Sequence, residues 1–410
     1  MKVAVVGAGI VGATAAHALL DEGHDVLVVD REGPAAGPSG GNAGWIAYTD
    51  ILPIASPKIL RQVPRFLVDP LGPLAIRPGY LLPLLPWLAR FVAAARPAAY
   101  ERSITAIAAL QALALPAWTR LAGQLGCEAL IHRRGGLYVY DDPAAFARAD
   151  RLAARQRELG ITVERLGAPD LRRMEPGLSQ SVVGAFLHPD IAHVSDPRQL
   201  TTAVFEAALA RGAHFLRRQV TNVAVGGGLR LACDGADAIS VDAVVLAAGA
   251  WSKPLAASLG DRIPLDTERG YNVSFPGVTG LVGRPIAFEG HGFVATPLDT
   301  GFRVGGAVEF GGLSAPPNHA RTRAIHAKAR RFLPALPDFE VGSVWMGFRP
   351  SIPDSLPVIG RARTSPKIVY AFGHGHYGLT QSAATARLVA DLLADRQSPI
   401  DLAPYRPDRF

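Results

Sequence analysis

The first thirty residues strongly constrain the fold of this chain. They contain, in order, an apolar run, a glycine-rich turn, a small-residue segment and a second apolar run. Residues 3–6 (VAVV) predict a buried strand, and residues 25–30 (DVLVVD) predict a second one. Between them, residues 13–23 predict a helix that ends at a glycine. Two strands joined by a helix predict a βαβ unit with parallel strands, and therefore an α/β fold.

Three glycines in the first turn follow the pattern G-x-G-x-x-G. Gly7 permits the tight turn, Gly9 lets a pyrophosphate approach the backbone, and Gly12 lets the helix pack closely on the strand. The N–H groups at the helix start would then bind phosphate. Asp30 ends the second strand, at the spacing of an acid that binds ribose hydroxyls. A structural turn would explain the glycines but not Asp30, so the pattern predicts dinucleotide binding.

Glycine spacing does not distinguish FAD from NAD, but two other small-residue segments bear on the choice. Residues 38–45 (PSGGNAGW) form a second glycine-rich loop that would let the backbone pass close to a flat, bulky ligand. A flexible surface loop is the alternative. Residues 247–252 (AAGAWS) end the apolar strand 241–249, where ligands bind in α/β folds. A packing turn is the alternative there.

A glycine- and histidine-rich segment, residues 373–380 (GHGHYGLT), precedes a helix at 381–394. We expect Thr380 to be its N-cap and its N-terminus to face the N1–C2=O edge of a flavin, where negative charge collects on reduction. His374 and His376 could bind a metal, but no third or fourth ligand is evident, so we expect none.

The composition excludes several classes of protein. Hydrophobic residues make up 49% and charged residues 19% of the chain, which is typical of a large buried core. The net charge of +7 favours anionic partners. Arginines are scattered and no nucleic-acid motif is present, so we expect no nucleic-acid partner. The only cysteines, Cys127 and Cys233, exclude a disulfide framework and fit a reducing compartment such as the cytoplasm.

One apolar segment invites a membrane interpretation. Residues 80–95 contain two prolines and Arg90 and are too short for a span of about 20 apolar residues, a length that we expect no segment to reach. A buried or cap-domain helix is one interpretation. The other is a peripheral contact with the inner face of the membrane, supported by Arg77, Arg90 and Arg96.

Dinucleotide-type elements at both ends and in the middle predict a discontinuous, Rossmann-like domain with an inserted α+β cap. We assign residues 1–60, 196–260 and 346–410 to an FAD-binding domain. Residues 61–195 and 261–345 would form a mixed-sheet substrate or cap domain.

Five segments resemble the D-amino-acid oxidase/dehydrogenase family of FAD enzymes, and most of all its D-amino-acid dehydrogenase small-subunit group. They are VAVVGAGIVGATAAHALLDEGHDVLVVD at 3–30, SGGNAG at 39–44, AAGAWS at 247–252, GFRPSIPDSLPVIG at 347–360 and GHGHYGLTQSAATARLVADLL at 373–393. They recur in order along nearly the whole chain. Residues 58–195 are only loosely similar, and substrate preference would be set there.

The resemblance implies a role for particular residues. The ADP half of FAD would contact Gly7, Gly9, Ile10, Val11, Gly12, Asp30 and Arg31, with the backbone of Val220 at the adenine. Ser39, Asn42, Ala43 and Gly44 would run along the pyrophosphate and flavin, and Ala248, Gly249 and Trp251 would pack near the dinucleotide. The flavin ring would be bordered by Gly375, Gly378, Leu379 and Thr380. Neither cysteine lies in a matching motif, so non-covalent FAD is expected. Arg349 would bind the substrate carboxylate, and Tyr271 would be a pocket tyrosine or a packing residue.

Arg349 also points to a carboxylate on chemical grounds alone. A guanidinium matches a planar carboxylate with two parallel hydrogen bonds. The alternative is an internal ion pair with a nearby acid such as Asp354.

Together these features predict an FAD-dependent enzyme that oxidises a free amino acid of D configuration. The Cα hydrogen would leave as hydride to flavin N5, and the imine product would be hydrolysed by water to a 2-oxo acid and ammonia. Tyr271 and His374 are the candidates for a general base. The electron acceptor would be oxygen, a quinone or an electron-transfer protein. The alternatives are oxidation of a secondary amine (sarcosine, D-proline or hydroxy-D-proline) and a non-catalytic flavin subunit of a dehydrogenase complex.

Overall fold

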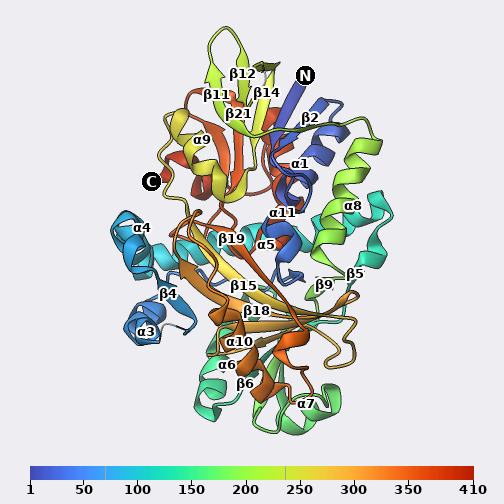
Figure 1. Cartoon of the computed structure of the whole chain (residues 1–410), viewed down its shortest axis with the longest axis vertical. Helices are drawn as coiled ribbons and strands as arrows, with labels where there is room; N and C mark the ends of the chain where they lie inside the picture. Colours follow the sequence, from blue (N-terminus) through green and yellow to red (C-terminus); the bar gives the residue numbers. More distant parts are fainter. Residues whose placement is uncertain (70, 236) are drawn as a thin grey trace.

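The computed structural model describes residues 1–69, 71–235 and 237–410 and contains two large sheets, one above the other in Figure 1. The predicted βαβ unit is present as β1 (Lys2–Val6), α1 (Ile10–Asp21) and β2 (Asp25–Asp30). The helix begins three residues earlier than expected, because Gly9 takes an extended conformation at the N-cap and the small residues after it continue the helix.

The upper sheet has six strands in the order β10-β2-β1-β14-β21-β20. Its later strands are β10 (His214–Arg217), β14 (Ala243–Leu246), β20 (Val358–Ala362) and β21 (Ser365–Phe372). The first five strands are parallel, and β20 runs antiparallel to β21. Strand β14 is buried throughout, as expected for a sheet that is covered on both faces.

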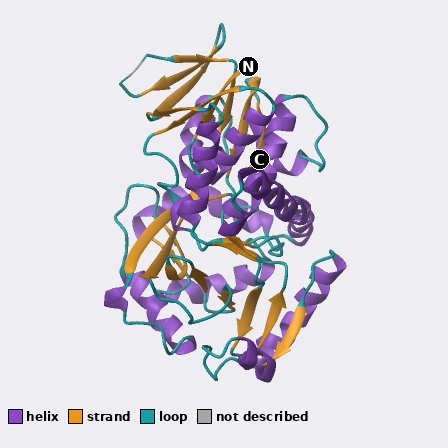
Figure 2. Ribbon diagram, turned by 90° about the vertical axis from the view of Figure 1, so that its right-hand side faces the viewer, coloured by secondary structure: helices purple, strands orange, loops and turns teal. Residues whose placement is uncertain are grey.

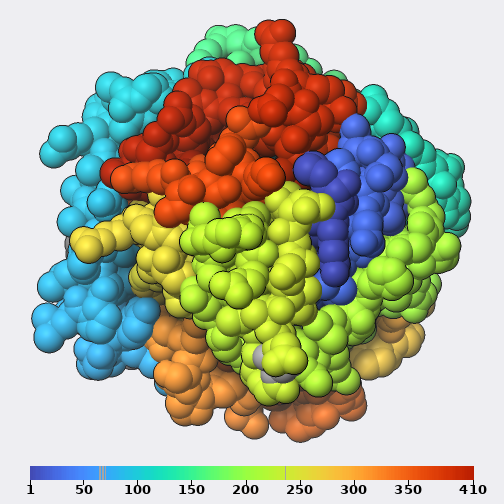
Figure 3. All heavy atoms as spheres, turned by 90° about the horizontal axis from the view of Figure 1, so that it is seen from above, coloured from blue at the N-terminus to red at the C-terminus, as the bar shows by residue number. Residues whose placement is uncertain are grey.

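Helices cover one face of this sheet and a small sheet covers the other. The helices are α1, α5 (Pro97–Leu125), α8 (Pro197–Ala210) and α11 (Gly378–Leu393), and the small sheet comprises β11 (Val220–Val225), β12 (Leu229–Cys233) and β13 (Ile239–Val241). Figure 3 shows the N-terminal, middle and C-terminal segments side by side at this end of the molecule. The expected discontinuous α/β fold is therefore confirmed.

Helix α5 corrects the expectation that no segment has the character of a membrane span. Its length and its mean hydropathy of 1.3 would suffice for a span. However, Ile107, Leu110 and Trp118 are fully buried, and the helix packs against α11. Its apolar residues thus serve the protein core, as also happens in soluble proteins.

The lower sheet has nine strands, with both parallel and antiparallel neighbours. Its strands lie in the lower half of Figure 2. Its path is β19 (Ser343–Ser351), β15 (Asp266–Pro276), β18 (Gly301–Phe310), β17 (Phe293–Leu298), β16 (Ile286–Phe288), β6 (Gly136–Tyr140), β8 (Gly184–His188) and β7 (Glu164–Gly167), with β4 (Leu74–Ile76) beside β18. Helix α10 (Ala320–Phe332) packs on β15 and β18 through an aromatic core.

Shorter elements connect the two sheets and flank them. They are α2 (Pro38–Gly41), β3 (Trp45–Ile46), α3 (Pro57–Val68), α4 (Leu81–Ala94), β5 (Ile131–His132), α6 (Pro143–Glu158), α7 (Ala168–Met174), β9 (Ala192–Val194) and α9 (Ser252–Ser258). Two features bear on the expected domain division. Strand β19 crosses the boundary placed at 346, and α5, assigned to the cap, packs with the helices of the upper sheet.

Candidate active site

A cavity of about 2070 Å³ is lined by residues from both large sheets. Apart from Gly12, all the residues singled out from the sequence as cofactor-binding or catalytic lie on its wall. Segments that are far apart in the chain therefore meet at one place. Gly12 lies behind this wall, in α1.

The first glycine turn is packed too tightly for side chains. Gly7 has a φ of +113°, and a Cβ atom there would lie 2.4 Å from the carbonyl oxygen of Ala247. A Cβ atom on Gly12 would lie 1.9 Å from the carbonyl oxygen of Gly7. Gly12 thus permits close packing of α1, while Ile10 and Val11 bring the helix N-terminus to the cavity wall.

The carboxylate of Asp30 is held rigidly at this end of the cavity. It accepts hydrogen bonds from the N–H groups of Ala8 (2.8 Å), Glu32 (2.8 Å) and Gly33 (2.9 Å). Beside it, the Arg31 guanidinium stacks 3.8 Å from the centre of the Trp251 ring. An anchored acid next to a helix N-terminus has the donor and acceptor chemistry that an ADP group requires.

The C-terminal loop differs from the expectation in one detail. Thr380 is not the N-cap of α11, because the helix begins at Gly378 and Tyr377 takes the N-cap position. The Thr380 hydroxyl instead accepts from the N–H of Ala47 (3.1 Å) and so ties α11 to the loop after β3. The N-terminus of α11 still opens onto the cavity through Gly378 and Leu379.

The two histidines of this loop have different partners. His374 is buried, and its Nε2 atom lies 3.0 Å from the Thr385 hydroxyl. His376 Nε2 lies 2.7 Å from a carboxylate oxygen of Glu268. Within the described part of the chain, no group of three or more His, Cys, Asp or Glu side chains could hold a metal ion.

Arg349 projects from β19 across the neighbouring strand β15 and reaches the cavity wall. Its path is open only because residue 270 is glycine: a Cβ atom there would lie 2.3 Å from the guanidinium carbon. Gly270 lies at a register shift between β15 and β18, a type of irregularity that is common next to active sites.

One guanidinium nitrogen of Arg349, Nη1, donates to the carbonyl oxygen of Ala307 (3.0 Å), a residue with the unusual φ of +57°. The other nitrogens have no hydrogen-bond partner among the residues that the structure describes. The internal ion pair with Asp354 is not formed, since Asp354 pairs with Arg409 at 2.9 Å. The half-buried Arg349 guanidinium therefore faces the cavity with most of its donors available.

Glu268 is the acid whose charge affects Arg349, and it lies directly across from it in the pairing of β15 with β19. Burial would raise the pKa of Glu268, but hydrogen bonds from His376 and Ser351 and the charge of Arg349 hold it below its usual value. Glu268 is thus an anion that orients this wall of the cavity.

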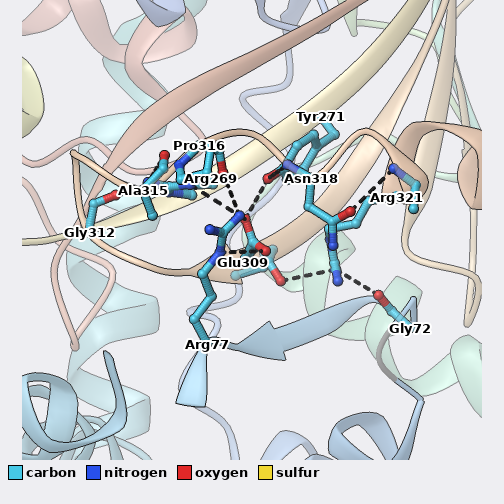
Figure 4. Close-up of polar contacts among 12 residues, drawn as sticks. Gly72, Arg77, Arg269, Tyr271, Glu309, Gly312, Ala315, Pro316, Asn318 and Arg321 are labelled. Atoms are coloured by element: carbon cyan, nitrogen blue, oxygen red, sulfur yellow. Dashed lines mark hydrogen bonds and ion pairs between the residues drawn. The ribbon is translucent and has the colours of Figure 1, made fainter. Parts of the chain in front are cut away.

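Tyr271 belongs to a buried polar network around Glu309 (Figure 4). Its hydroxyl donates to Glu309 (2.5 Å) and accepts from the N–H of Asn318 (3.1 Å). Arg77 bonds to the same carboxylate through Nε (3.1 Å). Tyr271 lines the cavity, but its hydroxyl is already engaged by Glu309 and Asn318.

A family model described as FAD dependent oxidoreductase (DAO) matches residues 2–392. The chain belongs to this DAO family. A "D-amino-acid oxidase" of Bradyrhizobium diazoefficiens is 38% identical over 100% of this chain and 98% of the relative. A "D-amino acid dehydrogenase 2" of Ralstonia nicotianae is 33% identical over 99% of both chains.

Solved structures of other proteins have the same overall fold as this chain. A glycine oxidase from Geobacillus kaustophilus superposes with a TM-score of 0.75 at 23% identity, over 100% of this chain and 99% of that one. An L-proline dehydrogenase from P. horikoshii gives a TM-score of 0.75 at 20% identity, over 100% and 97%. The expectations of a flavoenzyme of this family and of FAD as its cofactor are therefore confirmed.

The cavity of this DAO-family chain suits FAD in its own right. Two helix N-termini, of α1 and α11, open onto it, and their partial positive charge favours a pyrophosphate and an electron-rich flavin edge. A Cβ atom on Gly9 would already lie 3.0 Å from the Ser39 hydroxyl, so the cradle has no room for a larger side chain. The residues present thus fit the cofactor of the family.

Several cavity residues were not found from the sequence of this DAO-family member. They are Asp50, Tyr138, Glu268, Gly270, Glu289, Ala307 and Tyr377. For Glu268 a signal existed, since the segment 266–270 (DTERG) places three charged residues in a strand that is buried. Asp50 and Glu289 lie in separate loops, and neither carries a local pattern.

Proposed function

We propose that this chain catalyses the oxidation of a free amino acid of D configuration to the 2-oxo acid and ammonia. The observation that carries the proposal is the half-buried Arg349 guanidinium, which faces the cavity with unused donors. The full-length relatives named D-amino-acid oxidase and D-amino acid dehydrogenase support an amino-acid substrate.

FAD would be held non-covalently along the glycine turn, Asp30, residues 39–44 and the N-terminus of α11. When bound, it supplies the hydride acceptor of the reaction. Arg349 would bind the substrate carboxylate through two parallel hydrogen bonds, and Ala307 would keep the guanidinium plane fixed. Most of the catalysis would then be positioning of the substrate Cα.

The two general-base candidates meet surroundings that disfavour this role. Burial lowers the pKa of His374 to about 3, so the imidazole is uncharged at neutral pH and accepts a second proton poorly. Burial and the bond to Glu309 raise the pKa of Tyr271, so its hydroxyl stays protonated. We therefore assign substrate binding to Arg349 and a wall position to both of the others.

Electrons would pass from the reduced enzyme to a quinone or an electron-transfer protein, at the inner face of the membrane. Helix α4 supports this idea, because Leu81, Leu82, Leu85 and Val92 are exposed on it, Leu82 at 76%. Arg90 and Arg96 are exposed nearby, whereas Arg77 is tied to Glu309 and cannot serve an anionic surface.

Substitution of Arg349 tests the proposal. A charge-assisted contact contributes about 1.5–3 kcal/mol, so Arg349→Ala should lower kcat/KM by at least about ten- to hundredfold. Arg349→Lys should restore only part of this loss. Both variants should bind FAD and melt near the parent temperature. Loss of flavin or unfolding of Arg349→Ala, with a normal KM in what remains, would show that the arginine is structural.

A further inference from the structure

A second set of charged side chains lines the cavity, and the substrate-binding role of Arg349 makes no use of it. Asp50 follows β3 and Glu289 follows β16, and both half-buried side chains lie on the cavity wall. The Asp50 carboxylate accepts a hydrogen bond from the Tyr138 hydroxyl. The Glu289 carboxylate has no hydrogen-bond or ion-pair partner in the described ranges 1–69, 71–235 and 237–410.

Two acids of this kind destabilise the folded protein unless a ligand compensates for their lost hydration. A buried carboxylate without a partner loses its hydration and gains nothing in return. Burial and, to a lesser degree, the nearby charge of Glu289 raise the pKa of Asp50 to about 6, against the lowering effect of the hydrogen bond from Tyr138. Burial also raises the pKa of Glu289. A cation placed between the two carboxylates would stabilise both anions.

The protein's own cations do not fill this role by direct contact. Lys58 of α3 is close enough to lower the pKa of Glu289, yet its side chain is exposed and no ion pair joins them in the described structure. His291 is paired with Asp141 at 3.0 Å. Glu289 therefore faces the cavity with its charge unpaired.

The distance from Arg349 to this acidic wall fits an amino-acid side chain. The guanidinium lies against Ala307 of β18, and β18, β17 and β16 are consecutive strands. The N–H of Ala307 donates to the carbonyl of Gly292, so Glu289 lies near the same level of the sheet. Two strand spacings put the guanidinium and the Glu289 backbone about 10 Å apart. A side chain of the length of ornithine, lysine or arginine can bridge that gap.

We propose that the preferred substrate is an amino acid with a cationic side chain, an amine or a guanidine. Its carboxylate binds Arg349, and its side-chain cation binds between Glu289 and Asp50. This inference rests on the proposed function and names the substrate class of the same site.

The test is anaerobic flavin reduction of the holoenzyme by D-arginine, D-lysine and D-ornithine, compared with D-citrulline and D-leucine. D-Citrulline has nearly the shape of D-arginine without its charge. A charge-assisted contact should give D-arginine at least a tenfold advantage in the second-order rate constant, about the smallest effect such a bond produces.

Substitutions test which residues cause the preference for D-arginine over D-citrulline. Glu289→Gln and Asp50→Asn should each reduce the D-arginine to D-citrulline ratio several-fold or more. Glu164→Gln, an exposed glutamate on β7, is the matched control and should leave the ratio unchanged. Lys58→Met should keep or increase the preference, since it removes a competing cation. A preference for D-arginine that is absent in the parent and appears only in Lys58→Met would show that Glu289 serves Lys58 in the parent, and would overturn the inference.

A binding measurement without turnover provides an independent readout. 5-Guanidinopentanoate lacks the reacting amine and should perturb the flavin spectrum at lower concentration than the neutral 5-ureidopentanoate does. If neutral D-amino acids reduce the flavin as fast as D-arginine and Glu289→Gln changes no ratio, the inference fails while the proposed function stands. If no amino acid reduces the flavin, the proposed function fails as well.

Discussion

Substitution of Gly270 by alanine should damage substrate binding without altering a single charged group. The new methyl carbon would lie 2.3 Å from the guanidinium carbon of Arg349. Ordinary contacts between carbon atoms are about 3.5–4.0 Å, so the guanidinium must move by more than about 1 Å. That movement breaks its alignment with Ala307 and with a bound carboxylate.

A misplacement of about 1 Å can cost roughly a hundredfold in rate. We therefore expect Gly270→Ala to lower kcat/KM for the best amino-acid substrate about a hundredfold, close to the loss in Arg349→Ala. FAD content and melting temperature should stay near those of the parent, because alanine is acceptable in a strand. Gly226→Ala is the matched control, since no atom lies within 4 Å of a Cβ atom there.

A double-mutant cycle decides whether Gly270 acts through Arg349. If it does, the double variant Gly270→Ala/Arg349→Ala should be no slower than Arg349→Ala alone. Additive losses would mean that the methyl group obstructs the substrate directly. Parent-like kinetics in Gly270→Ala would refute the reasoning, because the arginine would then not be held in the position that the structure gives it.

Three further expectations concern the cofactor, acid stability and the electron acceptor. Gly9→Val should give folded protein without flavin absorbance, because its side chain would meet Ser39 and the pyrophosphate path, and normally yellow protein would argue against the motif assignment. Burial lowers the pKa of His193 to about 3. Between about pH 3 and 6.5 the unfolded chain therefore binds a proton at this histidine that the folded chain does not bind. The free energy of unfolding is thus highest above about pH 6.5 and falls as the pH drops. The loss at pH 5 amounts to about 2 kcal/mol, and thermal unfolding of His193→Gln should show a shallower decline between pH 8 and pH 5. Leu82→Asp/Leu85→Asp should abolish flotation with anionic vesicles and spare turnover with a soluble dye, whereas fast peroxide production and no vesicle binding by the parent would point to a soluble oxidase.

The cofactor half of the cavity could be predicted from the sequence because its determinants are local. Gly7, Gly9 and Gly12 are close in the chain, and Asp30 ends the very next strand. Their physical requirements, a tight turn and close helix packing, leave a readable pattern. Thr380 shows the limit of this approach. The helix begins three residues earlier than its capping preference indicated, and the Thr380 hydroxyl bonds to the loop after β3 instead.

In the substrate half of the cavity, the sequence predicted only a residue whose side-chain chemistry alone indicates its ligand. Arg349 stood out because a guanidinium in stiff backbone needs an anion. Its position, however, depends on Gly270 and Ala307, which lie in two other strands and become its neighbours only when β19, β15 and β18 pair.

The same reasoning explains why the acidic wall left no trace in the sequence. Asp50 and Glu289 are each unremarkable in their own segments, and their significance comes from a shared cavity that the fold creates. An unpaired acid that is enclosed in the protein core destabilises the folded state. Here both acids open onto the cavity that also holds Arg349, so their cost is offset only when a cation enters beside them. The charge pattern of this wall, an arginine at one end and two carboxylates at the other, is complementary to a zwitterionic substrate with a second positive charge.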